Sequence, residues 1–278
     1  MKRRLVPQAQ PDAPARRRDL TKTDVLEQLR SLGVLAGSIV LVHTSFRSLR
    51  PIEGGPRGLI EALHGAITPD GTLAMPSWTG SDDEPFDASR TPSAPDLGVV
   101  ASTFWRQPGV KRSEHAFALA ASGPHAEQIV TGPLPLPPHG HGSPVAHVHE
   151  LDGYVLLLGV GHDANTMVHF AEVMAGVPYR VPKHIAVMHD GFPARVQYHE
   201  NDHCCARFAL LDAWLRAAGL QREGRVGHAH ARLIRARDVV DVAVKHLETD
   251  PLVFLHPESE GCEECDAARL TVTPPRSH

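Results

Sequence analysis

The segment GVGHDANTMVHFAE (159–172) presents two imidazoles, a carboxylate, an amide and a hydroxyl directly after an apolar run that is typical of a buried strand. If a helix begins near Asp163, His169 and Glu172 share one of its faces, with Thr166 one turn before His169. A carboxylate beside an imidazole fixes its tautomer and raises its basicity. This arrangement suits a general base that takes a proton from an amine or an alcohol. A histidine that is only hydrogen-bonded fits the same spacing, and spacing alone favours that structural interpretation.

A second group of polar side chains follows the apolar run SIVLV, in the segment VHTSFRS (42–48). Hydroxyl and backbone N–H groups at a strand end, close to a helix start, can bind a phosphate or a carbonyl oxygen. The segment lacks the glycine-rich signatures of nucleotide-binding folds, and spacing alone favours an ordinary capping turn. The polar residues of this turn are His43, Thr44, Ser45, Arg47 and Ser48.

Charged residues gather in further segments. Lys111, Arg112 and His115 lie in VKRSEHAF (110–117), which can meet the phosphates of a nucleotide-like cofactor or form a solvated basic loop. Acidic runs are commonly solvated surface, but carboxylates that converge on one cleft make a site for a polyamine. The acidic residues in question, in the long polar segment 79–98 and at the end of an expected strand, are Asp82, Asp83, Glu84, Glu200 and Asp202.

The cysteines of the chain form two short clusters. They are Cys204 and Cys205, next to His203, and the C-x-x-C pair Cys262 and Cys265, downstream of His256. Both clusters together are compatible with a tetrahedral zinc site that clips the C-terminal region to the body. Because adjacent cysteines fit poorly into one tetrahedron, three cysteines with one histidine are an alternative set. Reduced thiols without any metal fit the sequence equally well.

The chain has 278 residues, of which 42% are hydrophobic and 22% are charged, as in a globular protein with a sizeable core. Its formal net charge of -4 argues against a protein that is held on nucleic-acid phosphates. No apolar run is long enough to span a bilayer, and the basic N-terminal segment lacks the apolar core of an export signal. We therefore expect a cytoplasmic protein with a solvated tail over 1–19 and one domain over 20–278, without a disulfide framework.

The elements that must position these residues follow from apolar spacing and turn signals. A helix is predicted from about Thr21 to Gly33, and residues 184–200 are typical of a hairpin with its turn at Asp190-Gly191. Further helices are predicted over 55–67, 99–107, 165–176, 205–219 and 236–248, and strands over 38–45, 72–78 and 154–161. The order mixes βα units with antiparallel hairpins and contains no internal repeat.

The ordered set of these segments resembles the aminoglycoside 3-N-acetyltransferase family, from about Leu20 to the C-terminus. The segments that carry the resemblance are VHTSFRSLRPIEGGPRGLIEAL, GTLAMPSW, VKRSEHAFALAASGPHA, LLLGVGHDANTMVHFAE and HARLIRARDVVDVAV. Three others resemble the branch of the family that acts on apramycin as well as on gentamicin- and tobramycin-like drugs. They are SWTGSDDEPFD, ENDHCC and GCEECDAAR.

The resemblance implies an enzyme that transfers the acetyl group of acetyl-CoA to the 3-amino group of the 2-deoxystreptamine ring of aminoglycosides, and so confers resistance. It also implies an α/β fold that is peculiar to this family, with a mixed central sheet, flanking helices and a smaller subdomain. This differs from the common N-acetyltransferase fold. The expected partners are the antibiotic and acetyl-CoA, bound by a monomer or homodimer, without nucleic acid or membrane.

The family's catalytic histidine falls on His169, for which we expect Glu172 as an orienting partner. Thr166, or backbone N–H groups of the turn 43–45, is then a candidate donor to the oxyanion. The predicted CoA contacts, in that turn and in the loop 111–117, are His43, Thr44, Ser45, Arg47, Ser48, Lys111, Arg112, Ser113, His115 and Phe117. The predicted antibiotic contacts are Trp78, Asp82, Asp83, Glu200 and Asp202. Neither Cys204 nor Cys205 is needed as an acyl carrier, and His162 is expected to be structural.

Two positions depart from the family pattern. The turn has Thr44 where many relatives have serine, which keeps a hydroxyl. The helix has Met167 where many have a second threonine or serine, which leaves Thr166 as the nearby hydroxyl.

Two other functions stay open. A zinc-dependent hydrolase would use the His-rich segments, although the chain has no HExxH motif. A zinc-stabilised protein without enzymatic activity would only sequester cationic antibiotics. Catalytic metal and loss of turnover on chelation would mark the hydrolase, and binding without consumption of acetyl-CoA would mark the sequestering protein.

Overall fold

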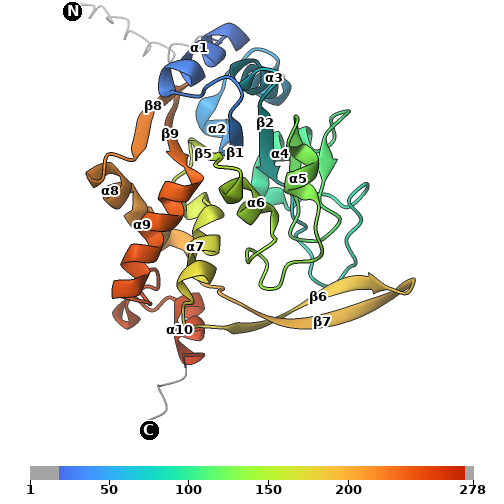
Figure 1. The fold of residues 1–278 in the computed structure, drawn as a ribbon, viewed down its shortest axis with the longest axis vertical. Helices are drawn as coiled ribbons and strands as arrows, with labels where there is room; N and C mark the ends of the chain where they lie inside the picture. Colours follow the sequence, from blue (N-terminus) through green and yellow to red (C-terminus); the bar gives the residue numbers. More distant parts are fainter. Residues whose placement is uncertain (1–18, 273–278) are drawn as a thin grey trace, which may run out of the picture.

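A mixed sheet forms the centre of the protein (Figure 1), whose residues 19–272 are described by a computed structural model. Its strands are β1 (Ile39–Thr44), β2 (Thr72–Pro76), β3 (Lys111–Arg112), β4 (Leu119–Ser122), β5 (Tyr154–Leu158), β8 (Gln221–Val226) and β9 (Ala229–Arg235). They lie in the order β3-β4-β2-β1-β5-β9-β8. The strand β1 is parallel to both of its neighbours, β2 and β5, and the other pairs are antiparallel. The predicted tail lies outside the described residues, apart from Asp19.

Helices cover both faces of this sheet (Figure 1). They are α1 (Lys22–Leu32), α2 (Phe46–Leu49), α3 (Gly55–Ile67), α4 (Gly98–Phe104), α5 (Ala126–Val130), α6 (Pro144–Glu150), α7 (Met167–Ala175), α8 (Leu210–Ala217), α9 (Ala236–Thr249) and α10 (Glu263–Leu270). The helices α1, α3 and α4 pack on one face, and α6, α7 and α9 pack on the other. The α/β fold with a mixed central sheet and flanking helices is therefore confirmed, and the division into domains stays a prediction.

The central strands have continuous apolar runs because both of their faces are buried. Successive side chains of a strand point to opposite faces. In β1, Ile39 and Leu41 accordingly pack in the core with α7 and α9, whereas Val40 and Val42 pack in the core with α1 and α3. Because both faces of β1 and β5 are buried, these strands are held firmly in the core. They in turn fix the positions of the residues that follow them.

The first helix begins and ends at the residues that the sequence indicates. Thr21 and Asp24 form a capping box, in which the Asp24 N–H donates to Thr21 Oγ1 (3.0 Å) and the Thr21 N–H donates to Asp24 Oδ2 (2.9 Å). Gly33 ends the helix with a φ of 110°, a left-handed conformation that favours glycine.

Two helices near the segment GVGHDANTMVHFAE (159–172) begin later than predicted. Residues His162–Ala164 form a separate 3-10 turn, η2, and α7 begins at Met167. Asn165 interrupts the helix with an extended backbone, and its side-chain oxygen accepts the N–H of Met167 at 3.1 Å. The helix predicted over 205–219 is likewise divided into a 3-10 turn, η3 (Cys205–Ala209), and α8.

An extended two-stranded arm, β6 (Val181–His189) and β7 (Phe192–Glu200), projects from the body below the sheet in Figure 1. Its turn lies at Asp190 and Gly191, whose φ values are 49° and 82°. Positive φ at both central residues is typical of the tight turn that joins twisted hairpin strands, so the predicted hairpin is confirmed. Within residues 19–272, no helix is long and apolar enough to cross a membrane.

Candidate active site

A cavity of about 340 Å³ opens at the edge of the sheet where β1, β2 and β5 end. Because these three strands are parallel, their carboxyl ends meet at one edge, which is where α/β sheets bind ligands. The turn after β1 and the turn after β5, far apart in sequence, thereby become neighbours. The cavity is lined by His43 and Thr44 at the end of β1, by Asn165 and Thr166 from the turn after β5, and by His169 of α7.

Glu172 fixes the imidazole of His169, as the helical spacing predicts. Glu172 Oε2 accepts a hydrogen bond from His169 Nδ1 at 2.9 Å, and His169 lies with 20% of its side chain exposed on the cavity wall. A proton held on Nδ1 leaves Nε2 as the nitrogen that faces the cavity. The arrangement is that of a histidine base with its orienting carboxylate.

Glu172 itself is fully buried and has two further donors that the sequence does not reveal. Tyr179 Oη and His203 Nε2 both donate to Glu172 Oε1, at 2.5 Å and 2.7 Å. Burial opposes ionisation of this carboxyl, but the charges and hydrogen bonds of His203 and His169 outweigh burial and lower its pKa to about 2. Glu172 is therefore a carboxylate at every working pH.

The same contacts act on His169 in the opposite direction. Burial lowers the pKa of His169, but the interactions with Cys205 and Glu172 outweigh burial and raise that pKa well above its ordinary value. Cys205 Sγ lies 3.4 Å from His169 Nε2, and it lines the same cavity. The site therefore contains a line of three groups, the thiol of Cys205, the imidazole of His169 and the carboxylate of Glu172.

Aromatic rings hold His169 from its sides. His139 stacks on it with 5.2 Å between ring centroids, and Phe208 meets it edge to face at 5.0 Å. Burial and the neighbouring His169 lower the pKa of His139 to about 3, so His139 is neutral. No pattern along the chain marks His139, which lies in the Pro/Gly-rich segment 133–144, because its place depends on how that segment folds over α7.

Of the five CoA contacts predicted around the end of β1, two line the cavity, His43 and Thr44. Burial lowers the pKa of His43 to about 3, and its Nε2 lies 3.3 Å from Thr166 Oγ1. The hydroxyl of Thr44 is buried and has no hydrogen-bond partner among the described residues. Ser45 and Ser48 pair with each other through their hydroxyls at 3.1 Å, and Arg47 is exposed.

Arg112 is occupied by the protein's own backbone. Its guanidinium donates to the carbonyls of Ser77, Ala88 and Thr91 at 2.6, 3.1 and 2.7 Å, and it lies over the ring of Trp105. It therefore fastens the loop 79–94 to the sheet edge, and because it does not line the cavity, its contact with CoA stays a prediction. The other predicted CoA contacts of this loop, Lys111, Ser113, His115 and Phe117, do not line the cavity, and their role stays a prediction.

The predicted antibiotic contacts differ in their distance from His169. Trp78 lines the cavity, and Glu200 shares a small hollow with His139 and His169. Burial and the neighbouring Asp202 raise the pKa of Glu200. Asp82 and Asp83 lie on the loop beside the hairpin arm.

Two of the other predicted acidic contacts already have cationic partners. Asp83 accepts from Arg195 at 2.6 Å and from His184 at 3.0 Å, and Asp202 pairs with Lys183. Two exposed carboxylates on the cavity wall, Asp96 and Asp163, were not predicted, because acidic residues before a helix are usually part of its N-terminal turn.

The predicted zinc site is not formed. Within residues 19–272, no three His, Cys, Asp or Glu side chains come together as ligands for a metal ion. The cysteine doublet is split, since Cys205 faces His169 while Cys204 Sγ lies 3.9 Å from His256 Nε2. The zinc-dependent hydrolase therefore has no metal centre in the described part of the chain.

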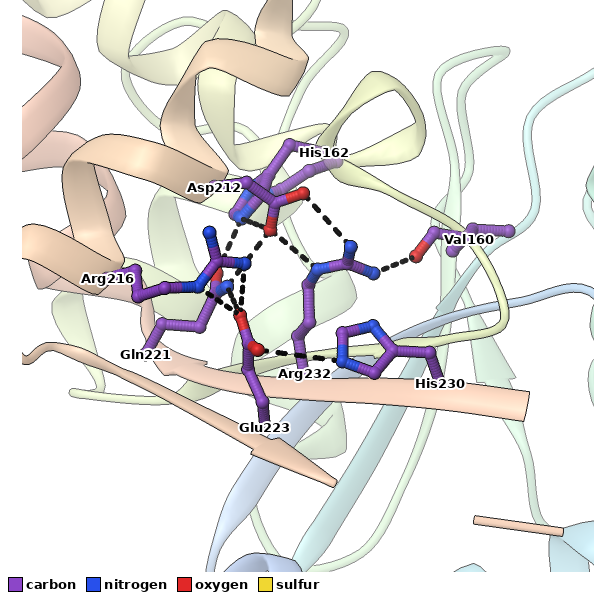
Figure 2. A network of polar contacts seen from close by, with 9 residues as sticks. Val160, His162, Asp212, Arg216, Gln221, Glu223, His230 and Arg232 are labelled. Carbon is purple, nitrogen blue, oxygen red and sulfur yellow. Dashed lines mark hydrogen bonds and ion pairs between the residues drawn. The ribbon is translucent and has the colours of Figure 1, made fainter. Parts of the chain in front are cut away.

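A polar network behind the cavity holds the turn η2 in place (Figure 2). Asp212 receives two hydrogen bonds from Arg232, at 2.6 Å and 2.9 Å, and Arg232 also donates to the carbonyl of Val160 at 3.1 Å. Val160 lines the cavity. The network thus joins α8 and β9 to the turn between β5 and α7.

His162 extends this network to the start of α7. Its Nε2 lies 2.8 Å from Gln221 Oε1, and its Nδ1 lies 3.1 Å from Asn165 Nδ2. With no exposed surface and a partner on each ring nitrogen, His162 is built in as a structural residue. Asn165 in turn holds Met167, the first residue of the helix that carries His169.

Comparisons with known proteins identify the family and agree with the fold. A family model described as aminoglycoside 3-N-acetyltransferase matches residues 41–248. Aminoglycoside N(3)-acetyltransferase IV of Salmonella sp is 63% identical over 240 residues, which cover 86% of this chain and 92% of that protein. These relationships extend to solved structures.

Two crystal structures of a mutant of aminoglycoside acetyltransferase AAC(3)-IVa match this fold. The complex with gentamicin has a TM-score of 0.92 at 62% identity and covers 93% of this chain and 100% of that chain. The complex with apramycin has a TM-score of 0.84 at 60% identity and covers 89% and 98%. A structure of AAC-IIIb with CoASH has a TM-score of 0.76 at 26% identity and covers 84% and 97%. The chain belongs to the aminoglycoside 3-N-acetyltransferase family.

Proposed function

We propose that this protein transfers the acetyl group of acetyl-CoA to the 3-amino group of the 2-deoxystreptamine ring of aminoglycosides, among them apramycin and gentamicin, and so confers resistance to them. One observation carries the proposal: His169 presents Nε2 to a cavity at the carboxyl ends of β1 and β5 while Glu172 holds Nδ1 at 2.9 Å. The relatives that bind gentamicin, apramycin and CoASH support the same pair of substrates.

The amine of an aminoglycoside arrives mostly protonated and must lose that proton before it can attack a thioester. In the neutral form of His169, Nε2 is the lone-pair nitrogen, so it takes this proton as the general base. The free amine attacks the acetyl carbon and forms a tetrahedral oxyanion. As the oxyanion collapses, the nitrogen gives its second proton to solvent, the C–S bond breaks, and the CoA thiolate leaves with the proton that His169 holds.

The oxyanion needs a donor that is not already in use. The N–H of Ser45 donates to the carbonyl of Leu158 at 2.9 Å, so this part of the turn is occupied. Thr166 and Thr44 both line the cavity, and a proton on His43 Nε2, which lies 3.3 Å from Thr166 Oγ1, leaves the hydroxyl hydrogen of Thr166 free to donate. We assign the oxyanion to the Thr166 hydroxyl and a second carbonyl or phosphate contact of acetyl-CoA to Thr44.

Carboxylates around the cavity suit a polycationic substrate. Asp96 and Asp163 are exposed on its wall, and Glu200 lies in the hollow beside His169. Because the first two stay solvated, they attract amines without the cost of burying a charge. We further propose that the enzyme works in the cytoplasm, where acetyl-CoA is made, as a monomer or homodimer.

An assay of thiol release from acetyl-CoA tests the proposal. With apramycin or gentamicin present we expect CoA to be released with and without a chelator, and nuclear magnetic resonance of the product should place the acetyl group on the 3-amino nitrogen. Immediate loss of turnover on chelation would instead identify the hydrolase. Stoichiometric drug binding without thiol release would identify the sequestering protein.

A further inference from the structure

Cys205 is a thiol within the cavity, and it is directed at the ring of the proposed base. Its Sγ lies 3.4 Å from His169 Nε2 and 3.6 Å from the carbonyl oxygen of His203, and the residue is partly exposed on the cavity wall. On the far side of the imidazole, Glu172 holds Nδ1. A nucleophile within reach of a base that a third group orients is the arrangement that activates a thiol.

The other cysteines do not have these surroundings. Cys204 precedes Cys205 in the chain, yet its Sγ faces His256 Nε2 at 3.9 Å instead of the cavity. Cys262 lies at the N-terminal cap of α10, and Cys265 has no exposed surface. The chain therefore contains an adjacent thiol that points away from the cavity, toward His256 and Cys262, and this thiol serves as the control.

The reaction brings a second sulfur to the same place. If acetyl-CoA places its acetyl carbon beside His169 Nε2, as the proposed function requires, the CoA sulfur comes close to that nitrogen as well. Cys205 Sγ is already at this nitrogen. The two sulfurs are then near neighbours in one cavity, a placement from which a disulfide can form.

We propose that Cys205 is a covalent modification site for disulfides that contain CoA, and that the mixed disulfide blocks acetyl transfer reversibly. The inference rests on the proposed function, since the cavity must admit CoA. The Cys205 thiol gives its proton to His169 Nε2 and attacks one sulfur of CoA disulfide. A Cys205–CoA S–S bond forms, the original S–S bond breaks, and the departing CoA thiolate takes the proton from His169. No external oxidant is consumed.

The attached CoA would occupy the cavity and keep the next acetyl-CoA out. A small thiol reverses the reaction by the same exchange, because it attacks the mixed disulfide and releases Cys205. The enzyme would therefore lose activity when the CoA pool is oxidised and regain it on reduction, with the antibiotic-modifying chemistry itself unchanged.

The test begins with thiol release from acetyl-CoA and apramycin by the untreated full-length protein. The protein is then incubated with CoA disulfide, and its intact mass, residual turnover and the modified residue, located by fragmentation of the cysteine peptide, are followed in time. We expect one CoA moiety on Cys205, a parallel loss of turnover, and recovery of both on addition of dithiothreitol. Oxidised glutathione, which has the same S–S bond without the nucleotide, should react at least about tenfold more slowly.

Two variants complete the test. Cys204→Ser should be modified and inactivated like the parent protein, whereas Cys205→Ser should gain no CoA. Mapping in the parent protein needs no variant, so the inference stays testable even if Cys205→Ser does not fold. An active enzyme that gains no adduct, or gains it on Cys204 or Cys262, would overturn the inference. An untreated protein without thiol release would overturn the proposed function instead.

Discussion

Glu172 Oε2 lies 2.9 Å from His169 Nδ1, one turn earlier on the same helix, while Glu172 Oε1 lies 2.7 Å from His203. The carboxylate thus joins a helix neighbour to a residue from the segment after β7. This one contact determines which ring nitrogen of His169 faces the cavity, and it underlies the first predictions below.

Replacing His169 by alanine removes the proposed base. We expect kcat to fall by about a hundredfold to ten-thousandfold, because the substrate amine would then have to lose its proton to water. Turnover is measured by thiol release at saturating acetyl-CoA and apramycin. His189→Ala, at the exposed tip of the hairpin arm, is the control and should keep the parent rate. Turnover of His169→Ala near the parent value would remove His169 from the mechanism.

Glu172→Gln keeps the shape of the side chain but removes its charge. Three groups donate to Glu172, namely His169, Tyr179 and His203. Glutamine has only one acceptor oxygen, so at least one of these donors would face its NH₂ group. We expect a loss of kcat, since Nδ1 is no longer held, and a free energy of unfolding lower by about 3 kcal/mol from the broken buried pair with His203. Kinetics and urea unfolding measure the two effects. Glu127→Gln, an exposed partner of Lys111, should change neither.

The sequence predicts the part of the site that depends on neighbours along the chain. His169 and Glu172 are paired by helical spacing, and the strands β1 and β5 are evident as apolar runs. That the ends of β1 and β5 meet at one sheet edge can be predicted only when the two strands are known to be parallel neighbours.

Contacts between distant segments are the part that spacing cannot reveal. The pair of His169 and Glu172 is surrounded by residues from three separate loops, Tyr179, His203 and His139. None of these three residues belongs to a helical or strand pattern in the sequence. Arg112 illustrates the same limit in reverse. Spacing did not reveal that this guanidinium donates to the backbone carbonyls of Ser77, Ala88 and Thr91, and its contact with CoA stays a prediction. The spacing of the cysteines suggested a zinc site. Spacing does not determine where the side chains point, and Cys204 and Cys205 point in different directions.

Asp163→Asn and Glu200→Gln test the acidic surroundings of the cavity. Both should raise the KM for apramycin by more than they lower kcat, because the carboxylates attract the cationic drug and take no part in the chemistry. The KM of the parent enzyme should also rise with added salt, more steeply than that of Asp163→Asn, since exposed charges are screened. Asp190→Asn at the hairpin tip is the charge-matched control. An unchanged KM in both variants would show that these carboxylates do not contact the drug.

The Asp212–Arg232 pair should stabilise the turn that lines the cavity (Figure 2). Arg232→Met leaves Asp212 without its main partner, and we expect the free energy of unfolding to fall by about 3 kcal/mol. The double variant Arg232→Met, Asp212→Leu should regain part of this loss, because no unpaired charge remains. Arg235→Met, which breaks the exposed pair with Asp152, should cost at most about 1 kcal/mol. Equal losses in Arg232→Met and Arg235→Met, measured by urea unfolding, would contradict the assigned role.

The pH profile of Cys205→Ser tests the coupling between the thiol and the base. As a general base, His169 works in its neutral form, so kcat/KM should rise with pH through the pKa of this residue. Burial lowers that pKa, but the contacts with Cys205 and Glu172 raise it overall. The rising limb of the parent enzyme's pH profile should therefore lie above the ordinary histidine value of about 6.5. Serine lacks the interactions through which Cys205 raises the pKa of His169, so the limb should move to lower pH in Cys205→Ser. The drug amine titrates identically with both proteins, and Cys204→Ser is the control that should keep the parent profile. Coincident limbs for Cys205→Ser and the parent would show that Cys205 does not set the basicity of His169.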